Sequence, residues 1–191
     1  HDARQALGIA PAGMVVSYVG SLYRNRAIDD VMRAAERIPS ATFRFIGGPE
    51  NERQRLMGKV AETGLVNVEF IGRVARDQIP LHLFASDVLL FTMNRQTLTF
   101  DICSPMKIFE YLAASRLIVA PNLPSMREVL RAPYAFLYTF PEQESLIVTI
   151  SAAIAAAKDG AVEKLENTAR NQVLNYYTWQ VRARAILKGL E

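Results

Sequence analysis

The sequence contains very little cysteine and histidine. Cys103 is the only cysteine among 191 residues, which excludes an internal disulfide framework and suits a reducing compartment. The only two histidines, His1 and His82, lie far apart in the chain, and neither is flanked by carboxylates at ligand spacing. We therefore predict no metal site, and we interpret His82, within the stretch 79–84, as a histidine on a helix surface with satisfied hydrogen bonds.

Long apolar runs and blocks of like charge are also missing. No apolar stretch reaches the roughly 18 residues that a membrane span needs, and no signal-peptide pattern opens the chain. The formal net charge is only +3, and the basic residues are spread out without interleaved aromatics, which argues against nucleic acid as a partner. We expect a cytoplasmic protein with a small anionic ligand. The opening stretch 1–4 is typical of the middle of a longer polypeptide.

Three familiar catalytic patterns are absent as well. The first predicted strand is followed by the single glycine Gly20, where a dinucleotide-binding fingerprint needs three. There is no Walker loop, and Ser104 precedes a proline without the Gly-x-Ser-x-Gly context of a hydrolase nucleophile. These absences exclude three large classes of enzyme as straightforward interpretations.

What the sequence does contain is a regular alternation of two kinds of segment. With 50% hydrophobic residues it can bury a substantial core, and short β-branched runs alternate with amphipathic stretches as far as Tyr138. This alternation predicts one α/β domain over 1–191, with a parallel sheet of about six strands and helices on both faces, followed by a helical C-terminal tail from Glu142. Strands are expected at 14–19, 43–46, 68–71, 88–91, 117–120 and 135–138, and helices at 28–38, 52–63 and 79–84.

In such sheets, ligands bind beyond the carboxyl ends of the strands. The loop after the first strand carries Gly20-Ser21 and then Arg24 and Arg26, the second carries Gly47-Gly48, and the third carries Gly72-Arg73. Glycine lets the backbone approach a ligand closely, and arginine supplies fixed positive charge. Each loop alone is a weak signal, because glycines also simply turn a chain and arginines also simply face solvent.

The most informative stretch is the block 104–114, Ser-Pro-Met-Lys-Ile-Phe-Glu-Tyr-Leu-Ala-Ala, which leads into the apolar run 117–121. Lys107 and Glu110 are three residues apart and therefore close together on the surface of one helix, which opens after Ser104-Pro105. A helix that enters a parallel sheet in this way is a common means of meeting a phosphorylated ligand.

Taken together, these segments resemble one known family. Val-Gly-Ser-Leu at 19–22, Phe-Ile-Gly-Gly at 45–48, the stretches 68–74 and 85–90, the block 104–114 and the stretch 118–124 follow one another as in a particular domain. That domain is the C-terminal, donor-binding half of GT-B fold glycosyltransferases of the group 1, family 4 type. The similarity covers roughly 14–187 and includes Tyr-Thr-Trp at 177–179 before the last helix. It implies a Rossmann-like sheet.

The resemblance also implies a function and a site. It implies retaining transfer of a sugar from a nucleotide-diphosphate donor, without a metal or other cofactor. Arg26 and Lys107 would stabilise the leaving diphosphate, since cations must neutralise it when no metal does. Glu110 would accept hydrogen bonds from the donor ribose, and Arg73 with Val74 would lie against the nucleobase. Further donor-binding positions implied by the family are Gly20, Ser21, Arg24, Gly47, Ser104 and Pro105.

The sequence departs from the family pattern at three positions. Ile102 stands where the first of two motif glutamates is expected, Ser21 stands for an arginine and Ser115 stands for a glycine. Family members also have an N-terminal domain that holds the acceptor, here expected to be a glycan or a lipid-linked molecule. We therefore expect the 191-residue chain to be a fragment that binds nucleotide weakly and transfers nothing alone. Membrane contact, if present, would lie in that other half, and the oligomeric state is left open.

Two other classes stay open on sequence grounds. One is a non-catalytic nucleotide-sugar-binding or interaction domain, because Ile102 replaces an acid. The other is half of a sugar-nucleotide epimerase or a phosphorylase, which share this half-fold. Trp179 likewise has two interpretations, since it could plug the core of its own domain or reach across to the other half.

Overall fold

The core of the protein is a single parallel sheet. A computed structural model describes residues 2–95, 106–165 and 168–188. The strand order is β3-β2-β1-β4-β5-β6, and every neighbouring pair is parallel, as predicted. The strands are β1 (Met14–Val19), β2 (Ala41–Ile46), β3 (Val68–Gly72), β4 (Val88–Leu90), β5 (Leu117–Pro121) and β6 (Ala135–Tyr138).

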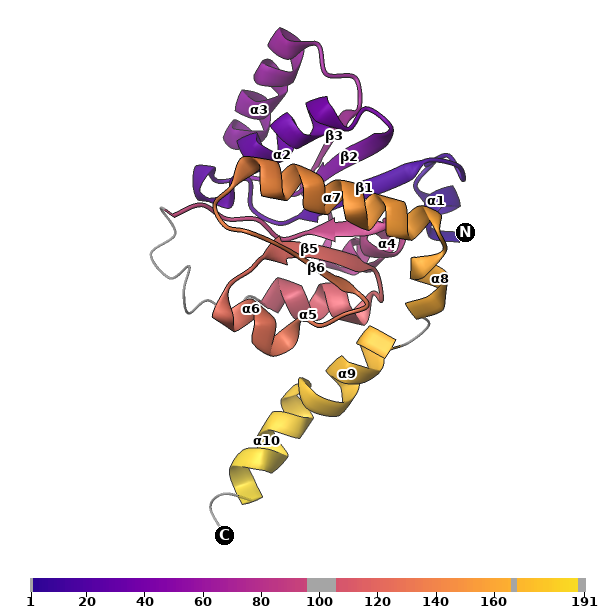
Figure 1. Cartoon of the computed structure of the whole chain (residues 1–191), viewed down its shortest axis with the longest axis vertical. Coiled ribbons are helices and arrows are strands. Elements are labelled where there is room, and N and C mark those ends of the chain that lie inside the picture. Colours follow the sequence, from indigo (N-terminus) through magenta and orange to yellow (C-terminus); the bar gives the residue numbers. More distant parts are fainter. Residues whose placement is uncertain (1, 96–105, 166–167, 189–191) are drawn as a thin grey trace.

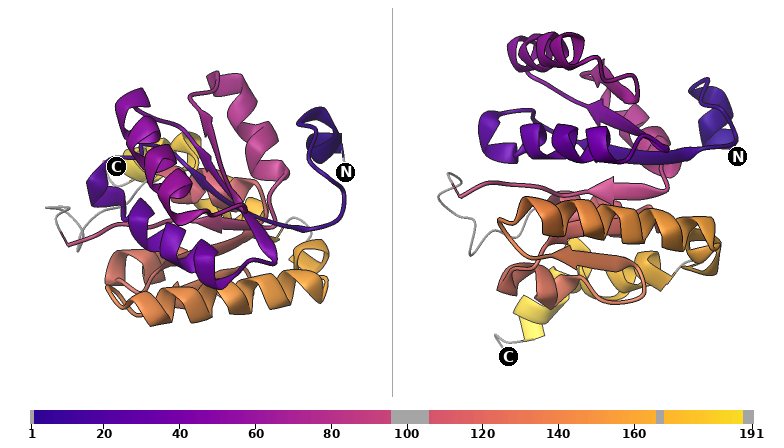
Figure 2. Two further views of the ribbon diagram at one scale, coloured as in Figure 1. Left: turned by 90° about the horizontal axis from the view of Figure 1, so that it is seen from above. Right: turned by 45° about the horizontal axis from the view of Figure 1, so that its top comes forward.

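Helices cover both faces of this sheet (Figure 2). Helices α2, α3 and α7 lie on one face and α4, α5 and α6 on the other, as expected for right-handed connections between parallel strands. The α-helices are α1 (Asp2–Ala6), α2 (Ile28–Arg37), α3 (Glu50–Thr63), α4 (Ile79–Phe84), α5 (Met106–Ala113), α6 (Pro124–Val129), α7 (Gln143–Lys158), α8 (Ala161–Leu165), α9 (Thr168–Tyr176) and α10 (Trp179–Lys188); the short 3-10 helices are η1 (Arg24–Arg26) and η2 (Arg76–Gln78). The predicted helical tail is confirmed.

Local sequence signals account for most element boundaries. In α2, the acidic residues Asp29 and Asp30 occupy the first turn, where the helix dipole favours them, and the apolar side chains of the helix face the core. Helix α3 ends at Gly64, which takes the left-handed conformation with φ 70°. The predicted boundaries of these strands and helices lie within two residues of the observed ones. Helix α6, which begins at Pro124, was not predicted.

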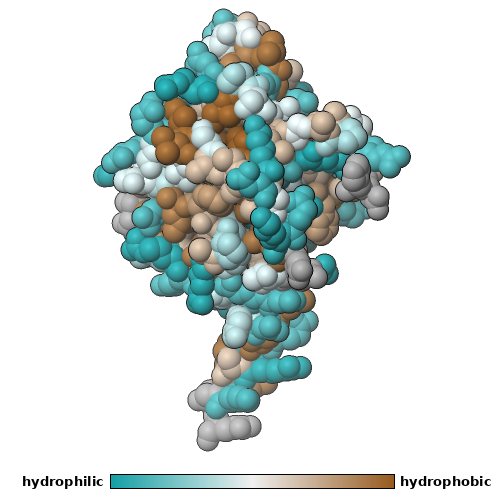
Figure 3. Space-filling model, turned by 45° about the vertical axis from the view of Figure 1, so that its right-hand side comes forward, coloured by the Kyte–Doolittle hydropathy of each residue, from teal (hydrophilic) through white to brown (hydrophobic). Residues whose placement is uncertain are grey.

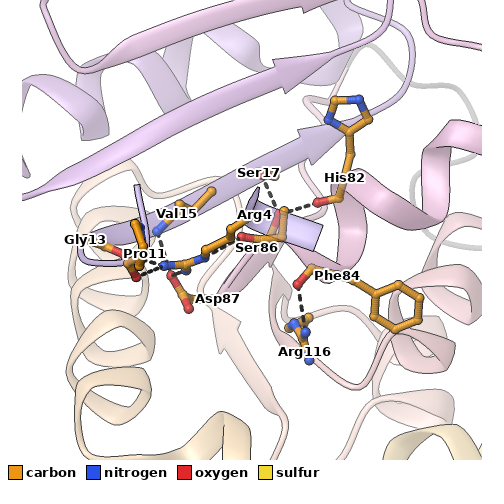
Figure 4. Close-up of polar contacts among 11 residues, drawn as sticks. Arg4, Pro11, Gly13, Val15, Ser17, His82, Phe84, Ser86, Asp87 and Arg116 are labelled. Carbon is orange, nitrogen blue, oxygen red and sulfur yellow. Dashed lines mark hydrogen bonds and ion pairs between the residues drawn. The ribbon is translucent and has the colours of Figure 1, made fainter. Parts of the chain in front are cut away.

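The amino-terminal edge of the sheet is closed by a network of direct polar contacts (Figure 4). The Arg4 guanidinium lies 2.5 Å from Asp87 Oδ2 and donates to the carbonyl of Ala85 at 3.1 Å. The same carboxylate accepts the backbone N–H of Val15 at 2.7 Å. Arg116 donates to the carbonyl of Phe84 at 2.7 Å. The starts of β1 and β4 are thereby tied to α1 and to the end of α4.

His82 corrects the sequence interpretation, because it is buried rather than on a surface. Only 4% of it is exposed, and its carbonyl accepts the hydroxyl of Ser86, which also hydrogen-bonds to the hydroxyl of Ser17 (Figure 4). Among the described residues, no group hydrogen-bonds to His82 Nδ1. Burial, and secondarily the charge of Arg44 on β2, lower the pKa of His82. Leu83 beside it is buried as well, so this side of α4 faces the core and carries the imidazole inward.

The C-terminal tail projects from the domain (Figure 1). Helix α9 packs on α5, and a 5.0 Å ring contact joins Phe109 to Tyr177, but α10 has no buried residue. Brown and teal side chains both line this tail in Figure 3, and the exposed apolar ones include Trp179, at 71%, Ile186 and Leu187. The interpretation of Trp179 as a plug of this domain's core is therefore wrong.

Within the described residues, no single helix is long and apolar enough to cross a membrane. Helix α7 and the segment 161–188 meet this criterion of length and composition only when they are taken together, across a bend of 80°.

Candidate functional site

The candidate site lies where the strands end, at the point where the chain reverses its direction across the sheet. Strands β1, β2 and β3 succeed one another in one direction, and β4, β5 and β6 succeed one another in the other. The boundary between β1 and β4 is therefore the topological switch point, where ligands bind in open α/β sheets. The predicted residues Gly20, Ser21, Gly47, Arg73 and Lys107 all lie at this edge.

The first two loops pack so closely that only glycine fits at two positions. The N–H of Gly20 donates to the carbonyl oxygen of Ile46 at 2.8 Å, and the N–H of Gly47 donates to the carbonyl oxygen of Gly72 at 2.8 Å. A Cβ atom on Gly47, which has φ 140°, would lie 1.8 Å from the carbonyl oxygen of Gly20. A Cβ on Gly20, which has φ 150°, would lie 2.2 Å from Lys107 Nζ. These glycines bring the backbone of two loops and a cation into one place.

Lys107 extends from the first turn of α5 over the first loop. Its ammonium lies 4.2 Å from the centroid of the Tyr18 ring and 6.0 Å from that of Phe91. One turn further along α5, the hydroxyl of Tyr111 accepts the N–H of Val19 at 3.1 Å and lies 3.2 Å from the carbonyl of Leu90. This fully buried tyrosine ties α5 to the ends of β1 and β4, and so determines where Lys107 stands.

Arg26 is positioned by the loop that follows β4. Its Nε donates to Ser21 Oγ at 3.3 Å, and its carbonyl accepts the hydroxyl of Thr92 at 2.7 Å. The side chain of Asn94 donates to the carbonyl of Arg24 at 2.9 Å. The structure therefore brings Arg26, Ser21 and Lys107 to one loop, as predicted, while the side chain of Arg24 is exposed at its margin. Sequence reasoning missed Thr92 and Asn94, which carry no recognisable motif.

A second group of predicted residues lines a cavity of about 540 Å³ beyond β2 and β3. Its lining includes Gly47, Gly48, Arg53 and Arg73. Arg73 lies across Gly48, since a Cβ there would meet Arg73 Cγ and Nε at 3.1 Å. Val74, the other residue that was expected to lie against the nucleobase, is partly buried against the core.

Glu110 faces a different cavity. It is exposed on α5 and lines a space of about 400 Å³ between α4, α5 and α9, together with Arg76 and Ile79 from the segment after β3. The remaining lining is mostly apolar, and it includes Arg170 and Leu174 of α9. Glu110 and Lys107 thus share a helix, but Lys107 is not among the residues that line this cavity. No sequence motif marks Arg76, Ile79 or the contribution of α9 to this cavity.

Ser104 and Pro105, both predicted to bind the donor, lie outside the described residues, as does Ile102. Among the described residues, no cluster of three or more His, Cys, Asp and Glu could hold a metal ion. The described part of the edge presents Arg24, Arg26 and Arg73, none of which forms an ion pair with another described residue. Such an arrangement can hold an anion.

Comparison with known proteins identifies the family. The sequence model described as glycosyl transferases group 1 matches residues 13–157. The chain belongs to this family. TuaH of Bacillus subtilis (strain 168), whose name assigns it to teichuronic acid biosynthesis as a glycosyltransferase, is 24% identical over 176 residues, which make up 92% of this chain and 43% of TuaH. This group 1 domain therefore spans less than half of that relative.

Solved structures establish the fold. Sucrose-phosphate synthase from Thermosynechococcus elongatus matches 99% of this group 1 domain with a TM-score of 0.81 at 19% identity, over 48% of its own chain. Anabaena HepE in complex with UDP and glucose matches 99% with a TM-score of 0.78 at 21% identity, over 50% of its chain. The chain has the fold of one half of a GT-B glycosyltransferase, which confirms the predicted fold class, while the match to the group 1 model confirms the predicted group.

Proposed function

We propose that this domain binds a nucleotide-diphosphate sugar and serves as the donor half of a retaining, family 4 glycosyltransferase that works without a metal. The observation that carries the proposal is the ammonium of Lys107 held over Gly20 at the switch point of the sheet. A nucleotide diphosphate is the anion that this family and this edge suit best. The UDP bound by HepE supports a uridine donor as the first to test.

Different residues of the site contact three parts of the donor, which are the diphosphate, the ribose and the nucleobase. Arg26 and Lys107 face the diphosphate, where their charges stabilise the negative charge that grows on the leaving group as the bond to the sugar breaks. Glu110 accepts hydrogen bonds from the ribose hydroxyls. Arg73 and Val74 lie beside the nucleobase, and the cavity beside Glu110 adds Arg76 and Ile79 to that region. Gly20 and Gly47 admit the phosphates close to the backbone, with Ser21, Arg24, Ser104 and Pro105 completing the donor site.

The whole enzyme needs a second half. The chain spans about half the length of the relatives that it matches. We propose that an N-terminal domain brings a glycan or lipid-linked acceptor to this donor site, in the cytoplasm and at the membrane surface through that domain. The name of TuaH supports polysaccharide synthesis as the pathway class. The isolated chain then binds donor but transfers nothing, because the reacting groups are not held together.

Calorimetric titration of the 191-residue chain with UDP, GDP and ADP in EDTA tests donor binding. We expect one diphosphate to bind selectively, and Arg26→Ala and Glu110→Gln each to weaken it about tenfold through loss of a charged hydrogen bond. Arg131→Ala before β6 and Glu62→Gln near the end of α3 are matched controls, since both side chains are exposed and lie toward the amino-terminal ends of the strands, and they should bind like the wild type. Binding that ignores Arg26 and Glu110 would contradict the assigned site.

One sequence observation favours a second candidate, a non-catalytic nucleotide-sugar-binding domain. Ile102 occupies the place of the motif glutamate that faces the sugar in the family. Release of nucleoside diphosphate by the protein containing both halves separates the two. Donor-dependent release that is lost in Lys107→Met indicates a transferase, whereas donor binding with unchanged background release in that variant indicates a binding domain.

A further inference from the structure

Tyr18 contacts two components of the site at once. It is the next-to-last residue of β1 and is 1% exposed. The face of its ring lies under the ammonium of Lys107, with 4.2 Å between Nζ and the ring centroid. Its hydroxyl donates to the carbonyl of Ser21 at 2.9 Å. One side chain therefore connects a cation on α5 to the first loop.

The ring of Tyr18 is itself held rigidly. Tyr18 pairs in register with Phe45 on β2, and Phe45 pairs with Phe70 on β3. The centroids of Tyr18 and Phe45 are 6.4 Å apart, and those of Phe45 and Phe70 are 5.0 Å apart in a stacked arrangement. Aromatic rings at these separations pack against one another. An aromatic row thus crosses three strands and ends under the Lys107 ammonium.

Loop contacts continue from the same point. Ser21 accepts two hydrogen bonds. Its carbonyl oxygen accepts one from the Tyr18 hydroxyl, and its side-chain oxygen accepts one from Arg26 Nε. Burial raises the pKa of Tyr18 well above its ordinary value, and the nearby charge of Arg26 offsets only part of this. The phenol therefore stays protonated and keeps donating throughout the working pH range.

We propose that Tyr18 is a positioning residue that aligns the two cations of the donor site, holding Lys107 by its ring face and the Ser21–Arg26 loop by its hydroxyl. The proposal deepens the function proposed above and rests on it for the effect on ligand affinity. A partly desolvated cation over an aromatic face gains attraction from the ring quadrupole. Holding Lys107 in place before the diphosphate arrives lowers the ordering cost of binding.

The first test is spectroscopic and needs no nucleotide. In the full 191-residue chain labelled with 13C-lysine, the ε-methylene signals of Lys107, assigned by their loss in Lys107→Met, should be shifted upfield by the Tyr18 ring. Tyr18→Phe should keep this shift and Tyr18→Leu should lose it. Phe43→Leu is the matched control, because it removes another fully buried ring of β2 that has no ring contact with Tyr18 among the described residues, and it should leave the shift in place. Unshifted signals in the wild type, or a shift that survives Tyr18→Leu, would overturn the proposal.

The second test measures affinity for the nucleoside diphosphate that binds the wild type. Tyr18→Leu should weaken binding about tenfold and Tyr18→Phe about threefold, which separates the ring from the hydroxyl. Phe43→Leu should change affinity less than twofold. In a Lys107→Met background, Tyr18→Leu should cost no more than the threefold loss that follows from the hydroxyl. A full tenfold loss there would reveal a merely structural role for Tyr18.

The two failures are distinguishable. A wild type that binds none of UDP, GDP and ADP contradicts the proposed function, while the lysine spectrum still decides whether Tyr18 holds Lys107. Binding that depends on Arg26 and Glu110 but not on the Tyr18 ring contradicts the positioning role alone.

Discussion

The two edges of the sheet hold several of their cationic side chains in different surroundings. At the amino-terminal edge, Arg4 meets the Asp87 carboxylate at 2.5 Å, and that carboxylate also accepts a strand N–H (Figure 4). At the carboxyl edge, Lys107 lies over the Tyr18 ring, Arg26 contacts a hydroxyl and Arg73 crosses a glycine. The Arg4 charge is neutralised by a carboxylate at the first edge, whereas Arg26 and Arg73 at the second form no ion pair with another described residue. The ion pair at the first edge stabilises the fold, and the second edge is the donor site that we propose.

Gly47→Ala is expected to have the largest effect, because it attacks the packing that shapes the carboxyl edge. The new Cβ would stand 1.8 Å from the Gly20 carbonyl oxygen at a backbone φ of 140°. We expect the free energy of unfolding to fall by about 3 kcal/mol, measured by urea titration, and nucleotide binding to be lost.

Gly58→Ala is the matched control for that change. Gly58 lies in the interior of α3, and a Cβ there meets nothing within 4 Å. It should raise stability by about 0.5 to 1 kcal/mol. Equal effects of the two substitutions would show that the close loop packing does not matter.

Asp87→Ala attacks the opposite edge. It leaves Arg4 and the N–H of Val15 without their acceptor in a region where the two charged side chains are only 15% and 17% exposed. We expect a loss of about 2 kcal/mol in the urea titration with nucleotide affinity unchanged. Asp77→Ala, at an exposed position of η2, should change neither quantity. A weaker nucleotide affinity in Asp87→Ala would contradict the view that the amino-terminal edge stabilises the fold without contributing to binding.

Arg26→Ala should give the converse result. Affinity for nucleoside diphosphate should fall about tenfold, and the loss should shrink as salt is added, because a charge contact is screened. The free energy of unfolding should change by less than about 0.5 kcal/mol, as is usual for a partly exposed side chain. A large loss of stability would show that Arg26 stabilises the fold, as Arg4 does, rather than binding the ligand.

The smallest expected effect concerns pH and the buried His82. Because burial lowers its folded-state pKa below the ordinary value of 6.5, the unfolded chain binds more protons just below that pH. The stability contributed by neutral His82 is thus complete above pH 6.5 and is lost as the pH falls through the folded-state pKa. Urea titrations at pH 7.5 and 5.5 should show a smaller decrease for His82→Leu than for the wild type. Equal decreases would mean that His82 does not titrate on unfolding.

Much of the candidate site could be predicted, because its residues follow strands. Gly20, Arg26 and Lys107 were placed at one edge by the rule that parallel strands end together, and the structure confirms their proximity. Tyr18 and Tyr111 were missed, since a tyrosine in a strand or a helix looks like core until its hydroxyl partners are known. The prediction that His82 lies on a helix surface was wrong for a related reason. A polar residue in an apolar hexapeptide gives no indication of the direction in which it points.

The sequence by itself determined the elements, their order and the family, because strand and helix periodicities and turn residues are local properties of the chain. Only the tertiary structure decided which side chains meet across distance. It placed the ammonium of Lys107 over Tyr18, gave Glu110 a cavity walled by α9, and left Trp179 exposed on a projecting helix. These contacts join residues from different elements, and their geometry depends on how the helices pack on the sheet, which no local pattern encodes.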